Sequence, residues 1–134
     1  MRKVLTVGVY DLMHIGHILF FKKAKALGDY LIVAVQKSEF IHKYKPNTNL
    51  IYNTEERMFM VESRKFVDEL ITYTDVDKLS NCVDFDVFAK GPDQIHQGFQ
   101  NMENWCIEHN KEVIVVPRTE GISSSQLRDY LKDK

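Results

Sequence analysis

The chain has few cysteines and no excess of charge of either sign. Among its 134 residues only Cys82 and Cys106 are cysteines, and they lack the C-x-x-C spacing that is typical of metal and redox sites. We interpret both as small apolar residues. The formal net charge is −1, whereas a nucleic-acid-binding protein normally carries a strong basic excess. The composition therefore argues against a cysteine metal site and against nucleic acid as a partner.

Long apolar runs are also missing. The run Val4–Val9 is too short for a signal peptide and leads directly into a polar turn. No stretch approaches the roughly 18 apolar residues that a membrane span requires. We therefore predict a cytoplasmic protein without a membrane span. A length of 134 residues suits one domain, so we treat residues 1–134 as a single domain.

Short apolar runs alternate with helical patterns along the chain. Lys3–Val9 is a predicted strand, apolar residues recur at helical spacing from Ile15 to Leu27, and Tyr30–Val35 is a second strand. Such a unit implies parallel strands and a right-handed crossover. Downstream, we expect strands at Val67–Ile71, Asp86–Ala89 and Glu112–Val116, a polar loop at Gln36–Asn53, and helices at Thr54–Arg64 (capped by Thr54), Val76–Val83, Gln100–His109 and Ser124–Leu131. The predicted fold is a single α/β domain, Rossmann-like, with a doubly wound parallel sheet of five strands and helices on both faces.

Three polar turns follow predicted strands, at residues 10–17, 90–98 and 118–125. Ligands of open parallel sheets bind beyond the carboxyl ends of the strands, near the point where the strand order reverses. We therefore expect the three turns to meet around one ligand.

The first turn combines glycines with two histidines at the start of a helix. Gly8 lets a ligand approach the end of the strand, and Gly16 lies in the first helical turn, where free amides attract anions. His14 and His17 are three residues apart, so both rings can project from one side of the helix start. Two imidazole donors beside free amides suit a phosphate group. A metal site is the alternative, but no cysteine or carboxylate stands at zinc-like spacing, so we predict no protein metal site. We interpret Asp11 as a turn residue.

The third turn is a second candidate for anion binding. Ser123 and Gln126 form a capping-box pattern, which by itself indicates only a well-formed helix start. Arg118, Gly121 and the additional hydroxyl groups are not explained by a cap. A guanidinium, a glycine and hydroxyl donors at a helix N-terminus together favour phosphate binding.

Together the two turns resemble motifs of the cytidylyltransferases in the H-x-G-H nucleotidyltransferase superfamily. The segment Gly8–His17 is similar to the signature of glycerol-3-phosphate and phosphocholine cytidylyltransferases, and 118–125 resembles their R-T-x-G-I-S-[ST]-[ST] motif. The resemblance implies that His14 and His17 contact the triphosphate and stabilise the transition state. It implies that Arg118 and its neighbours bind the triphosphate from the opposite side.

The resemblance extends to the middle of the chain, where this sequence also departs from it. Lys45 matches a lysine that contacts the phosphates, and Lys43 faces either substrate, although a solvated charge cluster is the alternative. Arg57 lies in an E-x-R pattern, and Lys65 stands where the family's R-Y-V-D-E segment has arginine. Ser38 stands where glycerol-3-phosphate enzymes tend to carry aspartate, and Asp93 is either a nucleotide contact or an ordinary turn residue. The departures leave the acceptor open.

We therefore predict transfer of CMP from CTP, with Mg²⁺, to glycerol 3-phosphate or a related phosphomonoester, giving a CDP-alcohol and pyrophosphate. The resemblance also implies a homodimer and a role in making surface polymer or lipid. The alternatives are an adenylyltransferase of the same superfamily and a nucleotide-binding module without catalysis. A class I aminoacyl-tRNA synthetase shares the histidine signature, but 134 residues leave no room for tRNA recognition. The predicted catalytic residues are His14, His17, Lys45 and Arg118; further nucleotide contacts are Gly8, Val9, Tyr10, Ile15, Gly16, Asp93, Thr119, Gly121, Ile122, Ser123, Ser124 and Ser125; acceptor contacts are Lys43, Arg57 and Lys65.

Overall fold

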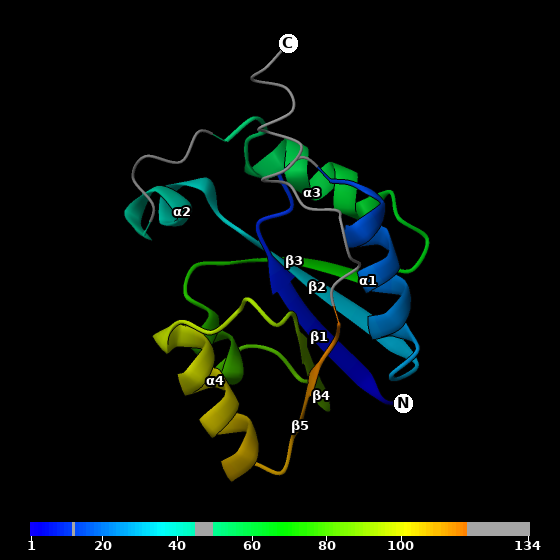
Figure 1. Cartoon of the computed structure of the whole chain (residues 1–134), viewed down its shortest axis with the longest axis vertical. Coiled ribbons are helices and arrows are strands. Elements are labelled where there is room, and N and C mark those ends of the chain that lie inside the picture. Colours follow the sequence, from blue (N-terminus) through cyan, green and yellow to red (C-terminus); the bar gives the residue numbers. More distant parts are fainter. Residues whose placement is uncertain (12, 45–49, 118–134) are drawn as a thin grey trace.

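A parallel β-sheet forms the centre of the molecule (Figure 1). The computed structural model describes residues 1–11, 13–44 and 50–117. The sheet has five strands in the order β3-β2-β1-β4-β5, and every neighbouring pair is parallel. The strands are β1 (Lys3–Gly8), β2 (Tyr30–Gln36), β3 (Glu69–Tyr73), β4 (Val87–Lys90) and β5 (Glu112–Val115). The strand order reverses at β1, which confirms the predicted doubly wound α/β fold.

Helices cover both faces of the sheet (Figure 1). Because successive residues of a strand point to opposite faces, Val4 packs with Phe21 of α1 on one face, and Leu5 packs with Met102 of α4 on the other. Both faces of the central strands are therefore apolar, as expected for a buried parallel sheet. The helices are α1 (Ile15–Lys25), α2 (Ser38–Tyr44), α3 (Thr54–Glu62) and α4 (Gln97–Glu108), with a 3-10 helix η1 (Val76–Asn81).

Several predicted elements needed correction. The predicted loop at 36–53 contains the short helix α2, and the helix at 76–83 is a shorter 3-10 helix. The N-cap of α3 is Asn53 rather than Thr54, because the Asn53 side chain accepts from the backbone N of Glu56 at 2.8 Å. The other elements lie within a few residues of their predicted bounds, and the predicted helix Ser124–Leu131 falls outside the described residues.

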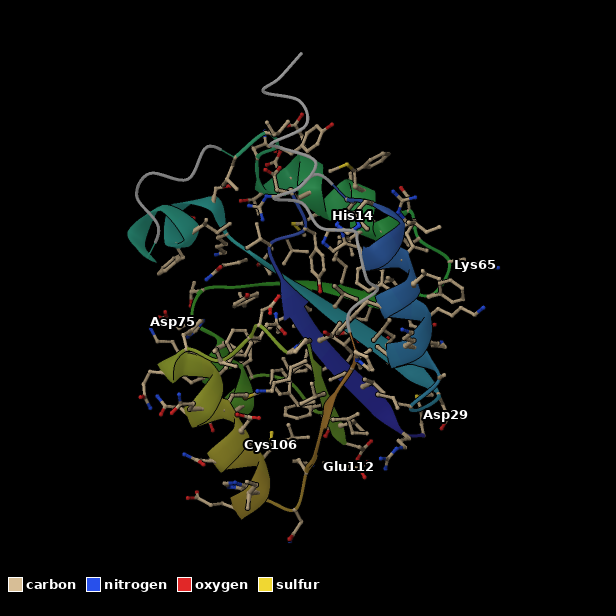
Figure 2. The ribbon with its side chains drawn as sticks, in the orientation of Figure 1. His14, Asp29, Lys65, Asp75, Cys106 and Glu112 are labelled. Atoms are coloured by element: carbon tan, nitrogen blue, oxygen red, sulfur yellow. The ribbon has the colours of Figure 1, made fainter. Side chains whose placement is uncertain are left out.

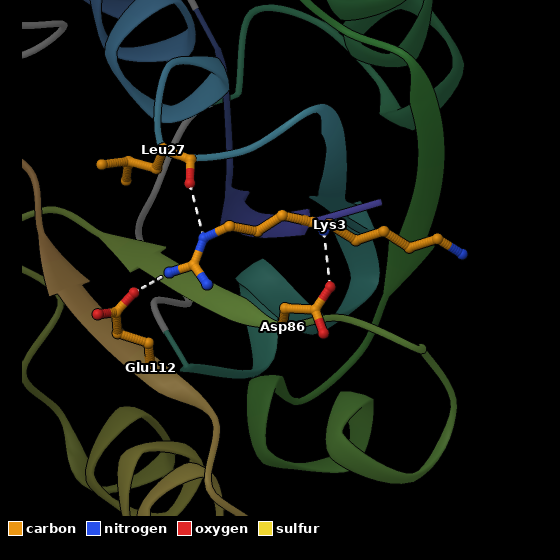
Figure 3. A network of polar contacts seen from close by, with 5 residues as sticks. Lys3, Leu27, Asp86 and Glu112 are labelled. Carbon is orange, nitrogen blue, oxygen red and sulfur yellow. Dashed lines mark hydrogen bonds and ion pairs between the residues drawn. The ribbon is translucent and has the colours of Figure 1, made fainter.

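Polar contacts connect the amino end of β1 to neighbouring segments (Figure 3). The backbone N of Lys3 donates to the carboxylate of Asp86 at 2.8 Å. Arg2 forms an ion pair with Glu112 and donates from Nε to the carbonyl of Leu27 at 2.9 Å. These contacts join β1 to the segments that begin β4 and β5 and to the end of α1. The carboxyl edge of the sheet, where ligands of open parallel sheets bind, lies at the opposite ends of the strands.

No helix among the described residues is long and apolar enough to cross a membrane.

Candidate active site

Two histidines form the start of α1 at the carboxyl end of β1 (Figure 2). His14 is the N-cap, and its Nδ1 accepts from the backbone N of Gly16 at 3.0 Å. The Nδ1 of His17 accepts in turn from the backbone N of His14 at 3.2 Å. The pair is a capping box in which imidazoles take the places usually held by serine and glutamate.

This capping box fixes the tautomer of both rings. A nitrogen that accepts a hydrogen bond carries no proton, so each neutral ring holds its proton on Nε2. The ring centroids of His14 and His17 are 4.1 Å apart, as expected for side chains that share one side of the helix start. Burial, and then the proximity of His14, lower the pKa of His17 to about 4. At neutral pH, His17 is therefore an uncharged hydrogen-bond donor beside a helix N-terminus, an arrangement that suits an anionic ligand.

The pKa of His17 predicts how stability depends on pH. In the unfolded chain this histidine becomes protonated as the pH falls below 6.5, whereas in the folded chain it stays neutral until about pH 4. Stability linked to His17 is therefore fully present above pH 6.5 and is lost as the pH falls toward 4, by at most about 3 kcal/mol. Between pH 7.5 and 4.5, we expect the free energy of urea unfolding to fall more steeply for the wild type than for His17→Asn, which lacks this titrating group. The other titrating groups are common to both proteins, so their contributions cancel in the comparison. Parallel curves for the two proteins would contradict the lowered pKa.

Tyr10 occupies the space in front of Gly8. Its backbone is left-handed, with φ 58°, which in a non-glycine residue costs on the order of 1–3 kcal/mol. This conformation folds the Tyr10 ring back over the strand, and a Cβ placed on Gly8 would lie 2.7 Å from the ring. Glycine at position 8 therefore makes room for Tyr10. We had expected that space to admit a ligand.

Asp11 connects the first turn to the segment before α3 through hydrogen bonds. The residue is 3% exposed, and its carboxylate accepts from the backbone N of Ile51 at 2.9 Å and of Tyr52 at 3.0 Å. The sequence indicated only a local turn residue. No local pattern pointed to a partner 40 residues away.

Arg57 is completely buried beside the same turn. Its guanidinium donates at 2.8 Å to the carbonyls of Val9 and Gln36, which lie at the carboxyl ends of β1 and β2. The other hydrogen bonds go to the Tyr52 carbonyl and to the hydroxyls of Ser38 and Thr54. Burial lowers the pKa of Arg57, although Asp11 acts in the opposite direction. We predicted an acceptor contact here, and the structure adds a role that the sequence did not reveal: Arg57 joins two strand ends to the start of α3.

The turn after β4 is joined to β1 by Gln94. The Gln94 amide donates from Nε2 to the carbonyl of Val7 at 2.9 Å and accepts through Oε1 from the backbone N of Gly91 at 3.0 Å. It thus spans β1 and β4 at the point where the strand order reverses, and the exposed Asp93 lies beside it. Lys90, which is 6% exposed, pairs with Glu103 of α4 at 2.9 Å. Sequence reasoning missed Gln94 because a glutamine in a polar turn carries no distinguishing pattern.

Of the remaining predicted site residues, the structure describes only some. Lys65 is exposed, with its Nζ 5.1 Å from the ring centroid of Phe66, and Figure 2 shows it at the outer edge of the molecule. Ile15 is 57% exposed in the first turn of α1, and Lys43 belongs to α2. Outside the described residues lie Lys45, Arg118, Thr119, Gly121, Ile122, Ser123, Ser124 and Ser125. Within residues 1–11, 13–44 and 50–117, no three His, Cys, Asp or Glu side chains gather as a metal-binding group.

Comparison with known proteins identifies the family. A cytidylyltransferase-like family model matches residues 5–130. The chain belongs to the cytidylyltransferase-like family. It is 37% identical over 135 residues to glycerol-3-phosphate cytidylyltransferase of Bacillus subtilis, with 98% of each chain covered. It is also 37% identical to FAD synthase of Picrophilus torridus, over 94% of this chain and 93% of that protein.

A solved structure supports the same fold. The lipopolysaccharide core biosynthesis protein from Thermoplasma volcanium matches with a TM-score of 0.71 and 26% identity, over 89% of this chain and 97% of that one. The predicted family and enzyme class are thus confirmed: the protein is a cytidylyltransferase, a nucleotidyltransferase that uses CTP.

Proposed function

We propose that the enzyme transfers CMP from CTP to glycerol 3-phosphate, giving CDP-glycerol and pyrophosphate. The observation that carries the phosphate-handling part is the histidine capping box, which leaves the Nε2–H groups of His14 and His17 as donors at the N-terminus of α1. Similarity to glycerol-3-phosphate cytidylyltransferase over nearly the full length of both chains supports the acceptor.

In the proposed reaction, a phosphate oxygen of glycerol 3-phosphate attacks the α-phosphorus of CTP in line. The new P–O bond forms as the bond from the α-phosphorus to the bridging oxygen breaks, and pyrophosphate leaves with the electron pair. The nucleophile is already an anion, so no protein base is required. Catalysis then consists of positioning and of stabilising negative charge on the phosphates.

We assign the donors as follows. His14 and His17 donate from Nε2 to phosphate oxygens, and the uncharged state of His17 avoids two adjacent cations at a ring separation of 4.1 Å. Lys45 and Arg118 are proposed as additional cations because their segments resemble the family's phosphate-binding motifs. Mg²⁺ arrives on the phosphates of CTP as part of the substrate, as this ion usually does in phosphoryl-transfer enzymes.

The proposed nucleotide contacts otherwise follow the resemblance. The residues that would line the nucleotide are 8–10, 15, 16, 93, 119 and 121–125, and Lys43 and Lys65 are the candidate acceptor contacts. Arg57 would act on both substrates through the strand ends and the α3 segment that it holds. A homodimer, a cytoplasmic location and a role in supplying a CDP-alcohol for surface polymer or lipid are further proposals from the same resemblance, and light scattering tests the first.

A comparison of nucleotide and acceptor pairs tests the proposal. Purified protein with Mg²⁺ is given CTP or ATP, each with glycerol 3-phosphate, phosphocholine or FMN, and pyrophosphate release and the ³¹P spectrum of the product are measured. We expect CTP with glycerol 3-phosphate to exceed every other pair by at least about 10²-fold in kcat/KM, the ratio expected when a site lined for one substrate leaves polar groups unpaired with another.

The FAD synthase similarity makes ATP with FMN the sharpest rival pair. Faster turnover of that pair would replace the proposed function with adenylyl transfer. CTP binding without pyrophosphate release on any acceptor would support a nucleotide-binding module instead.

A further inference from the structure

Tyr10 is a large aromatic residue in a backbone conformation that favours glycine. Its φ of 58° lies in the left-handed region, which side chains with a Cβ rarely adopt. Glycine would adopt this conformation freely, so the presence of tyrosine calls for a function of its ring. Strained residues of this kind gather at active sites, where the surrounding structure holds them.

The ring of Tyr10 lies between the end of β1 and the first turns of α1. It covers Gly8 on the strand side, and only 7% of the residue is exposed. On the helix side, its centroid is 5.7 Å from the His17 ring at an interplanar angle of 77°, and 5.3 Å from the Phe21 ring. His17 and Phe21 are one helical turn apart, so the tyrosine spans one turn of the inner face of α1.

His17 is consequently held on two sides. Tyr10 meets it edge to face, and His14 lies against it with ring centroids 4.1 Å apart and an interplanar angle of 33°. The hydrogen bond from the His14 backbone to Nδ1 of His17 fixes one atom of the ring, and a single bond leaves the ring free to tilt about that atom. The two flanking rings restrict this tilt and thereby set the direction of Nε2.

We propose that Tyr10 is a positioning residue that orients the His17 imidazole so that its Nε2–H points at the triphosphate. The inference rests on the proposed function for its catalytic consequence, but the orientation of His17 is measurable without any substrate. We assign the role to the ring, since the contacts to Gly8, His17 and Phe21 are all made by the ring, whereas the hydroxyl lies beside Thr6.

Two substitutions separate the contribution of the Tyr10 ring from that of its hydroxyl. Tyr10→Phe keeps the ring, and Tyr10→Leu removes it while retaining an apolar side chain. Phe85→Leu is the matched control, because Phe85 is also a buried ring, and it packs against Trp105 in the cluster on the opposite face of the sheet. All three proteins are compared with the wild type in thermal unfolding, so that loss of stability is measured separately.

The first measurement is the orientation of the His17 ring at pH 7.5, from residual dipolar couplings of its Cδ2–H and Cε1–H bonds. We expect the wild type, Tyr10→Phe and Phe85→Leu to show the couplings of one fixed ring orientation, and Tyr10→Leu to show couplings reduced by averaging over several orientations. A purely structural role for Tyr10 would lower the unfolding temperature and leave these couplings unchanged, which would overturn the proposal.

The second measurement is turnover with CTP and glycerol 3-phosphate. We expect Tyr10→Leu to lower kcat by roughly 10–100-fold, the size of effect expected when a catalytic group is misplaced by about 1 Å, with the KM for CTP changed by less than about threefold. Phe85→Leu should stay near the wild type, and Tyr10→Phe, which keeps the ring, should retain more turnover than Tyr10→Leu. Unchanged kcat in Tyr10→Leu would overturn the positioning role. Absence of turnover in the wild type itself would instead overturn the proposed function, and the measurement of ring orientation would still decide the role of Tyr10.

Discussion

Replacement of His17 by asparagine is expected to lower kcat by roughly 10²–10³-fold while the start of α1 stays intact. The asparagine side-chain oxygen lies near the position of Nδ1 and can still accept from the backbone of His14, which in the wild type donates at 3.2 Å. What the variant loses is the Nε2–H donor. His14→Asn likewise removes an Nε2–H donor and keeps the helix start, since asparagine is among the most favoured N-cap residues. The measurements are kcat, the KM for CTP and the thermal unfolding temperature.

His96→Asn is the matched control for these variants. His96 is the N-cap of α4, and its Nδ1 accepts from the backbone N of Gly98 at 3.1 Å, as His14 does from Gly16. The same chemical change is therefore made at a second helix start that has no assigned role in the reaction, and we expect near-normal turnover. Near-normal turnover of His17→Asn as well would remove this histidine from the mechanism.

Substitution of Arg57 by methionine is expected to destabilise the fold by about 3–5 kcal/mol. The variant would leave the buried carbonyls of Val9 and Gln36 without their donors at the carboxyl edge of the sheet. Because typical domains are stable by only about 5–15 kcal/mol, this is a large share of the total. Arg57→Lys keeps the charge but loses the planar fork, so we expect an intermediate loss of about 2–3 kcal/mol. Urea unfolding at pH 7.5 measures both.

Arg2→Met is the corresponding control at the surface. Arg2 has a 45% exposed side chain and pairs with the exposed Glu112, so its removal should cost less than about 1 kcal/mol. If Arg57→Lys kept wild-type stability but raised the KM for glycerol 3-phosphate, the direct acceptor contact predicted from the sequence would be favoured over the structural role.

Local patterns in the sequence were sufficient for the central elements and for the histidine turn at the start of α1. Apolar runs of strand length around a helical pattern predicted β1, α1 and β2 close to their observed bounds. The histidine turn was also readable, because His14, Gly16 and His17 act on one another within a single helical turn. Where two local patterns competed, the sequence misled: Asn53 and Thr54 are both good caps, and Thr54 is instead engaged by Ser38 and Arg57.

Only the tertiary structure decided how the turns are held together. The partners of Asp11, Arg57 and Gln94 lie 40, 48 and 87 residues away along the chain. Each of these contacts is made at the carboxyl edge of the sheet, where the parallel strand order brings distant turns side by side. Hydrophobic periodicity and capping patterns do not predict such a contact. The contact depends on which strands are neighbours in the sheet and not on the residues that flank it in the sequence. The sequence by itself therefore determined the local form of the histidine turn, and the strand order determined what holds that turn in place.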